Sequence, residues 1–219
     1  MRGVIFVNGR VDDYAALARR LRADDLLVGA DGGTRHILAI GLRPHLVVGD
    51  LDSLPSSTVQ ELTAQGVAIE RHPVRKDQTD LELAIECALR RGVDAILMVG
   101  GMGGRLDQTV ANLLILVQRA WPVPLSIAEG DQEATVLRGP GQLTLHGRVG
   151  ATVSAIPLSA EVSGITYVGL EYPLEDATLA LGSTRGVSNA LAGPTATITV
   201  AAGLLLVVRA GPDSGALAP

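Results

Sequence analysis

Short apolar runs recur along the first 130 residues, and amphipathic stretches separate them. The runs predict strands near residues 3–7, 26–30, 46–49, 67–71, 94–100 and 125–129. The stretches between them predict helices near residues 12–22, 33–40, 56–65, 78–91 and 105–119. Three helix starts are signalled by Asp12, by Ser56 or Ser57 with Glu61, and by Thr79 with Glu82. This alternation predicts a parallel α/β sheet with helices on both faces, in which ligands bind at the carboxyl ends of the strands.

The pattern changes after Trp121–Pro124. From about residue 133 onward, short β-rich runs such as 142–145, 152–156 and 195–200 are split by glycine and proline, and no helix is expected. Many short strands with frequent turns predict a small β-sandwich or barrel. The expected fold class is therefore α/β followed by all-β: a parallel-sheet α/β domain over residues 1–130 and a small β-sandwich or barrel domain over residues 131–219. Residues 211–219 are expected to fray.

Composition narrows the class of protein. The chain has 219 residues, of which 47% are hydrophobic and 19% charged, as in a soluble globular protein. A net charge of −5 with no basic patch argues against a nucleic-acid partner. The lone Cys87 leaves no disulfide framework or cysteine metal site, and the four histidines show no metal-ligand spacing. No signal peptide or membrane span is expected, so we predict a cytoplasmic protein.

Three acidic clusters follow predicted strands: Gly49–Ser53, Lys76–Glu82 and Gly103–Asp107. If the strands are parallel, the clusters share one edge of the sheet. Carboxylate oxygens gathered there suit Mg²⁺, which is usually held by one or two carboxylates plus substrate phosphates. The sequence therefore predicts a metal–nucleotide site.

Each cluster also has a purely structural interpretation. Asp50 and Asp52 alternate in an extended segment and can face one ion, although a solvated acidic turn would look the same. Asp77 and Asp80 are three residues apart and can share one face of a helix, but acidic residues in a first helical turn also complement the helix dipole. Lys76, the only lysine of the chain, is a plausible phosphate partner.

Two glycine-rich turns add candidate phosphate contacts. Asp31–Thr34 follows a predicted strand and precedes a helix, so its glycines allow close backbone approach to a ligand, while Asp31 could also simply cap the helix. Gly100–Arg105 can cradle phosphate oxygens on backbone N–H groups with an arginine behind them. It is neither a Walker loop nor a dinucleotide-binding fingerprint.

Together these motifs resemble the thiamine pyrophosphokinase family, also called thiamine diphosphokinase. The resemblance rests on six ordered motifs that span nearly the whole chain: Asp31–Gly33, Gly49–Ser53, Lys76–Asp80, Gly103–Asp107 with Asn112, Gly169–Leu174 and Gly186–Asn189. It implies an N-terminal α/β domain for ATP, a C-terminal β-domain that helps to bind thiamine, and a homodimer with active sites between subunits. The implied reaction transfers the terminal diphosphate of ATP to the thiamine hydroxyl and releases AMP.

The resemblance also implies roles for individual residues. Five aspartates would have catalytic roles, and three of them would bind Mg²⁺. The catalytic residues are Asp50, Asp52, Asp77, Asp80 and Asp107. The metal residues are Asp50, Asp52 and Asp80. Asp77 and Asp107 would position thiamine or its hydroxyl. Tyr172 would stack on the pyrimidine ring, and Ser188 and Asn189 would supply polar contacts. The residues expected at ATP are Asp31, Gly32, Gly33, Ser53, Lys76, Thr79, Gly103, Gly104 and Arg105.

Some choices stay open. A primary hydroxyl is a poor nucleophile, so an aspartate near it could accept its proton, and both Asp107 and Asp77 are candidates. Tyr172 could stack on the ligand or be a half-buried strand residue. Gln108 follows Asp107, so no histidine base is expected there. Diphosphate transfer to another alcohol, such as a pterin, and a non-catalytic sensor of thiamine diphosphate or nucleotide are the alternative functions.

Overall fold

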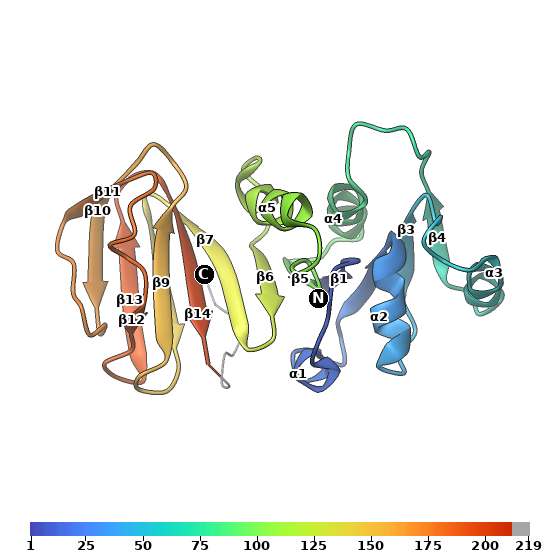
Figure 1. Cartoon of the computed structure of the whole chain (residues 1–219), viewed down its shortest axis with the longest axis horizontal. Coiled ribbons are helices and arrows are strands. Elements are labelled where there is room, and N and C mark those ends of the chain that lie inside the picture. The colour runs from blue at the N-terminus through green and yellow to red at the C-terminus, as the bar shows by residue number, and fades with distance from the viewer. Residues whose placement is uncertain (212–219) are drawn as a thin grey trace. The chain divides into compact units, whose positions relative to one another are not determined.

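The computed structural model describes residues 1–211, so the prediction for the tail lies outside the described residues beyond Gly211. Contacts divide the chain into two compact units, Met1–Gly130 and the part that begins at Asp131 (Figure 1). Among the described residues, no helix is long and apolar enough to cross a membrane.

The first unit is built on six parallel strands in the order β6-β5-β1-β2-β3-β4. The strands are β1 (Arg2–Phe6), β2 (Leu26–Ala30), β3 (Leu46–Gly49), β4 (Ala68–Arg71), β5 (Ala95–Val99) and β6 (Leu125–Glu129). The helices are α1 (Tyr14–Arg19), α2 (Thr34–Ala39), α3 (Ser56–Ala64), α4 (Asp80–Arg90) and α5 (Leu106–Leu114), with 3-10 turns η1 (Asp31–Gly33) and η2 (Ile115–Val117). All six predicted strands and five predicted helices are present.

The central strands are apolar runs rather than alternating ones, because a parallel sheet with helices on its faces is buried on both sides. β3 is buried at every residue, whereas β4, at the edge of this sheet, is exposed at both ends. The sheet of this unit ends at β4, which pairs with β3 alone among the strands described.

Of the three predicted start signals only Thr79 acts as a side-chain cap, although α3 begins at Ser56 as predicted. Thr79 caps α4 and accepts a hydrogen bond from the backbone N–H of Glu82 at 3.2 Å. The cap of α1 is Asp13 and not Asp12, and α3 begins after Pro55 without a side-chain cap. The helix that we expected over residues 105–119 is shorter in the structure, since α5 ends at Leu114 and η2 follows.

The second unit is antiparallel and contains no helix among its described residues, as predicted. One set of strands has the order β12-β9-β14-β7 and the other β11-β10-β13-β8. The strands are β7 (Gln132–Arg138), β8 (Gly141–His146), β9 (Thr152–Pro157), β10 (Glu161–Val168), β11 (Ala177–Ala180), β12 (Asn189–Ala190), β13 (Thr195–Val200) and β14 (Leu204–Ala210). Apolar residues of both sets, among them Val153 and Leu205 of the first and Leu145 of the second, form one core, which is the arrangement of a sandwich. The predicted fold class is therefore confirmed.

Candidate active site

A cavity of about 530 Å³ opens in the first unit at the carboxyl ends of its strands. Its walls come from the segments after β1, β2, β3 and β5, from the segment before α4, and from α4 and α5. The lining residues are Val7, Asn8, Gly9, Ala30, Asp31, Asp50, Val74, Lys76, Gln78, Thr79, Asp80, Leu81, Gly101, Gly103, Gly104, Arg105, Gln108 and Asn112. A pocket at this edge of a parallel sheet is where ligands of α/β proteins bind.

Three carboxylates meet at this edge. Asp31, Asp50 and Asp52 each offer an oxygen, and these oxygens lie within 4.8 Å of one another. Asp31 is 7% exposed, and its Oδ1 has no hydrogen-bond partner among the described residues. Ionised carboxylates this close repel one another, and a divalent cation relieves the repulsion. The donor set, which consists of hard oxygens with one buried and unpartnered, therefore fits Mg²⁺.

The backbone turns sharply to bring these groups together. Asp31 and Leu51 adopt positive φ angles of 46° and 66°, a conformation that costs free energy for residues other than glycine. Gly49, at the end of β3, has a φ of +148°, and a Cβ there would lie 2.9 Å from the Cβ of Asp31. A side chain at position 49 would therefore push the ends of β2 and β3 apart.

Gly32 and Gly33 are buried in packing contacts and do not line the cavity. A Cβ on Gly33 would lie 1.9 Å from the carbonyl oxygen of Phe6, and one on Gly32 would meet the Asn8 side chain at 2.5 Å. The close approach expected from these glycines is thus made to the protein itself, at the start of α2.

Lys76 forms the cationic wall of the cavity. Its Nζ lies 2.8 Å from Asp80 Oδ1 and 3.8 Å from Asp50 Oδ2. The side chains of Lys76 and Asp50 are only 14% and 13% exposed, so solvent screens the ammonium less than at an open surface. The structure thus pairs Asp80 with Lys76 and brings Asp31, rather than Asp80, to the other two carboxylates.

The third predicted cluster contains an exposed ion pair. The Arg105 guanidinium donates from Nε to Asp107 Oδ1 at 3.1 Å and from Nη2 to Asp107 Oδ2 at 2.5 Å. These hydrogen bonds hold the pKa of Asp107 below its ordinary value. Arg105 lines the cavity but Asp107 does not. Behind them, Asn112 Nδ2 donates to the carbonyl oxygen of Gly101 at 2.7 Å and fixes the glycine-rich turn.

Asp77 is not placed as the spacing predicted. Because α4 begins at Asp80, Asp77 precedes the helix and does not share a helical face with it. The Asp77 side chain is exposed and does not line the cavity. Asp52 and Ser53 do not line the cavity either, although Asp52 belongs to the group of three carboxylates. Asp52 receives a hydrogen bond from Ser53 Oγ at 3.1 Å.

Sequence reasoning missed the loop after β1. Asn8 and Gly9 line the cavity, and the side chain of buried His36 holds this loop. His36 Nε2 lies 3.0 Å from the carbonyl oxygen of Gly9, and Nδ1 lies 2.8 Å from the hydroxyl of Tyr14. Burial lowers the pKa of His36, so the neutral ring is favoured, with Nε2 donating to Gly9 and Nδ1 accepting from Tyr14. The signal that could have found this loop is its place at the end of the first strand.

Three predicted thiamine contacts lie in the second unit. Tyr172 is 63% exposed, so it is not the half-buried strand residue of the structural interpretation. The Asn189 side chain is buried and bonds to the Tyr172 backbone in both directions: Nδ2 donates to the carbonyl oxygen at 2.7 Å, and Oδ1 accepts from the N–H at 2.9 Å. Ser188 has a φ of 62° and donates its backbone N–H to Ser154 Oγ. Asn189 therefore supports the loop that presents Tyr172.

Fold and cavity together define a class of protein: an α/β unit with an acidic, lysine-containing cavity at the carboxyl ends of its parallel strands, followed in the chain by a β-sandwich. Two family descriptions match the chain. "Thiamin pyrophosphokinase, catalytic domain" matches residues 17–123, and "Thiamin pyrophosphokinase, vitamin B1 binding domain" matches residues 142–205.

Individual relatives agree with this. Thiamine pyrophosphokinase from Bacillus subtilis is 31% identical over 186 residues, covering 84% of this chain and 86% of the relative. A crystal structure of thiamine pyrophosphokinase from the same organism superposes with a TM-score of 0.86 at 27% identity, covering 96% of this chain and 99% of that one. Thiamin pyrophosphokinase from Geobacillus thermodenitrificans gives a TM-score of 0.85 at 31% identity over 98% and 99% of the two chains.

The chain belongs to the thiamine pyrophosphokinase family. The family and the enzyme class predicted from the ordered motifs are confirmed, and the comparisons support neither the pterin alternative nor the sensor alternative.

Proposed function

We propose that this chain transfers the terminal diphosphate of ATP to the hydroxyl of thiamine, giving thiamine diphosphate and AMP. The observation that carries the proposal is the cavity lined by Asp31, Asp50 and Lys76 at the carboxyl edge of a parallel sheet, with the Lys76 ammonium 3.8 Å from Asp50. Such a set of charges suits a nucleoside triphosphate that arrives with Mg²⁺, and the family supplies the acceptor. On this basis residues 1–130 form the ATP-binding catalytic domain and residues 131–219 the thiamine-binding domain.

Diphosphate transfer needs little covalent help from the protein, because positioning and charge neutralisation carry most of the work. We propose that Asp50 and Asp52 bind Mg²⁺ with Asp31 beside them, and that Asp80 stays a predicted fourth carboxylate. When bound, the ion would neutralise phosphate charge and orient the diphosphate. Lys76 would donate to phosphate oxygens from its position between Asp50 and Asp80.

The glycine-rich turn would complete the phosphate site. Gly103 and Gly104 line the cavity with Arg105, whose guanidinium can donate to a phosphate in two parallel hydrogen bonds. Thr79 supports the same wall as the cap of α4. Among the other residues predicted at ATP, Ser53 acts through its hydrogen bond to Asp52, and Gly32 and Gly33 act through the packing of the Asp31 turn.

Asp107 is the better supported of the two candidate bases. It is bonded to Arg105, a residue of the cavity wall, whereas Asp77 is exposed and lies outside that wall. With Arg105 in place the carboxylate is a weak base, since its pKa is lowered. Transfer of Arg105 to phosphate would release Asp107 to accept the proton of the thiamine hydroxyl.

We also propose a homodimer that brings the exposed Tyr172 to an active site. A stripe on α5 supports an interface, because Leu106, Val110 and Leu114 recur every four residues and are 78%, 47% and 49% exposed. Tyr172 would stack on the thiamine ring, Asn189 would hold its loop, and Ser188 would add a polar contact. A cytoplasmic location stays a prediction.

The test is incubation of the purified chain with ATP, Mg²⁺ and thiamine, followed by separation of the nucleotides and thiamine esters. One AMP for each thiamine diphosphate is expected. Formation of ADP, or no turnover with thiamine, would contradict the proposal. A parallel reaction with a hydroxymethyl pterin in place of thiamine is the matched control and should give no AMP.

A further inference from the structure

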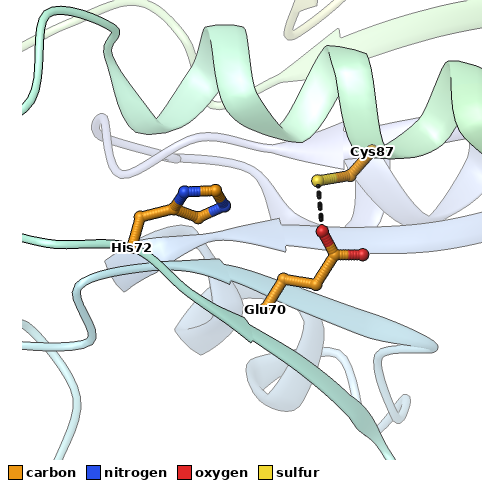
Figure 2. A group of neighbouring side chains, drawn as sticks. All are labelled: Glu70, His72 and Cys87. Carbon is orange, nitrogen blue, oxygen red and sulfur yellow. Dashed lines mark hydrogen bonds between the residues drawn. The ribbon is translucent and has the colours of Figure 1, made fainter.

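A second group of side chains with metal-ligand atoms lies outside the lining of the cavity. Glu70 is on β4, His72 follows that strand, and Cys87 is on α4, and each offers one ligand atom within 4.8 Å of the other two (Figure 2). None of the three lines the cavity. The sequence suggested no cysteine metal site because no second cysteine and no histidine spacing motif exist, but the fold supplies the missing ligands from a neighbouring strand.

The side chains are positioned toward one another. The Cys87 side chain is 1% exposed, and its Sγ lies 2.9 Å from Glu70 Oε2. The His72 ring points toward this pair, and its Nε2 is buried without a hydrogen-bond partner among the described residues (Figure 2). A buried ring nitrogen normally finds a partner, so its orphaned state is an independent sign that a ligand completes the group.

Two arginines already meet Glu70, and they differ in how they would respond to a cation. Arg91 donates to Oε1 at 2.8 Å and can stay there as an outer partner that orients the carboxylate. Arg90 donates to Oε2 and to Cys87 Sγ, the atoms a metal would use, but its side chain is 58% exposed and can turn into solvent. A bound cation could therefore displace the Arg90 side chain, whereas Arg91 would stay beside Glu70.

We propose that Glu70, His72 and Cys87 form a binding site for Zn²⁺, with water as the fourth ligand. The mixed nitrogen, sulfur and oxygen donors suit this ion, whereas Mg²⁺ prefers oxygen alone. Tetrahedral Zn²⁺ places its ligand atoms about 3.3–3.8 Å apart, so the three groups need only small side-chain movements. Binding releases the thiol proton of Cys87 to solvent, because the thiolate is the ligand.

The ion would tie the edge strand β4 to α4. His72 begins the segment that carries Lys76, and α4, which ends that segment, begins at Asp80 in the cavity wall. Both ends of the segment would then be fixed to one ion. The expected consequence is structural: Zn²⁺ raises the thermal stability of the chain and restrains the segment between residues 72 and 80.

Cobalt titration of the full-length chain, stripped of metals with a chelator, tests the site. Co²⁺ reports thiolate ligation through a charge-transfer band in the near ultraviolet. We expect this band to saturate at one equivalent and to disappear on addition of Zn²⁺. It should be absent in Cys87→Ser, and His72→Gln should weaken binding by about tenfold or more.

Two controls separate this site from other metal sites. His146→Gln removes an exposed histidine, and Asp52→Asn removes a carboxylate of the Asp31–Asp50–Asp52 group; both should leave the band and its affinity unchanged. Absence of the band from the wild-type chain would overturn the proposal, as would an unaltered affinity in His72→Gln. Because His72 is only partly buried, His72→Gln keeps the test decisive if Cys87→Ser fails to fold.

Discussion

The ammonium of Lys76 lies 2.8 Å from Asp80 Oδ1, four residues along the chain. This pair joins the segment before α4 to the first residue of that helix. Asp50, which directly follows β3, lies 3.8 Å from the same ammonium. A single lysine thus offsets negative charge from two elements of the cavity, and its loss should affect substrate binding and local repulsion together.

Replacing Lys76 with methionine should lower turnover and raise the Michaelis constant for ATP. A charge-assisted hydrogen bond is worth about 1.5–3 kcal/mol, which corresponds to a loss of about 10- to 150-fold in kcat/KM for ATP. Steady-state kinetics with ATP varied at saturating thiamine measure the effect. Arg75→Met is the matched control, since it removes the neighbouring, exposed cation and should leave kcat/KM unchanged. Equal losses in both variants would point to net charge rather than to Lys76.

Asp52→Asn should abolish most turnover while the fold is kept, because Asp52 is an exposed member of the carboxylate group. Residual activity should need a higher Mg²⁺ concentration, since one ionised ligand is lost. Activity measured over a range of Mg²⁺ concentrations, together with circular dichroism, tests this. Asp24→Asn, an exposed aspartate outside the group, serves as control. Unchanged activity in Asp52→Asn would remove this residue from the metal site.

The sequence predicts the fold better than it predicts the site. Strand and helix positions follow from local periodicity, so the predicted ends of these elements differ from the observed ends by only a few residues. The partners of Asp31 and Asp80 do not follow from it, since these depend on positive φ angles at Asp31 and Leu51 and on the direction that the Lys76 side chain takes toward Asp80 and Asp50. The Glu70–His72–Cys87 group is likewise invisible in the sequence, because β4 and α4 meet only in the folded chain.

Tyr172→Ala should raise the Michaelis constant for thiamine more than the constant for ATP. The side chain is 63% exposed and so is free to contact a ligand, and its removal should cost little stability. Asn189→Ala should have a similar effect on thiamine, because the Asn189 side chain holds the Tyr172 backbone by two hydrogen bonds. Tyr172→Phe keeps the ring and is the matched control. Equal effects of Tyr172→Ala on both constants would argue against stacking on thiamine.

Tyr167→Phe should stabilise the second unit or leave it unchanged. The Tyr167 hydroxyl is buried and has no hydrogen-bond partner among the described residues, and burial raises its pKa to about 12. An unsatisfied buried hydroxyl costs about 1–3 kcal/mol, and the substitution removes it without emptying the core. Urea unfolding of both proteins measures the difference. A loss of stability of more than about 1 kcal/mol would show that the hydroxyl is bonded in solution.

His36 should make the stability of the chain depend on pH. Burial lowers its pKa from 6.5, so the unfolded chain binds the proton more readily than the folded one. The stabilisation is therefore complete above pH 6.5 and is lost as the pH falls through the lower, folded pKa.

His36→Gln keeps a donor for the Gly9 carbonyl but loses the ring nitrogen that accepts from Tyr14, so it should be less stable at neutral pH, by about 1 kcal/mol. This variant no longer titrates at position 36. Its stability should also change less between neutral and mildly acidic pH. Urea midpoints over that range test both points, with His146→Gln as the exposed control that keeps the wild-type slope. A wild-type stability that rises on acidification through this range would contradict the assignment of a neutral, buried His36.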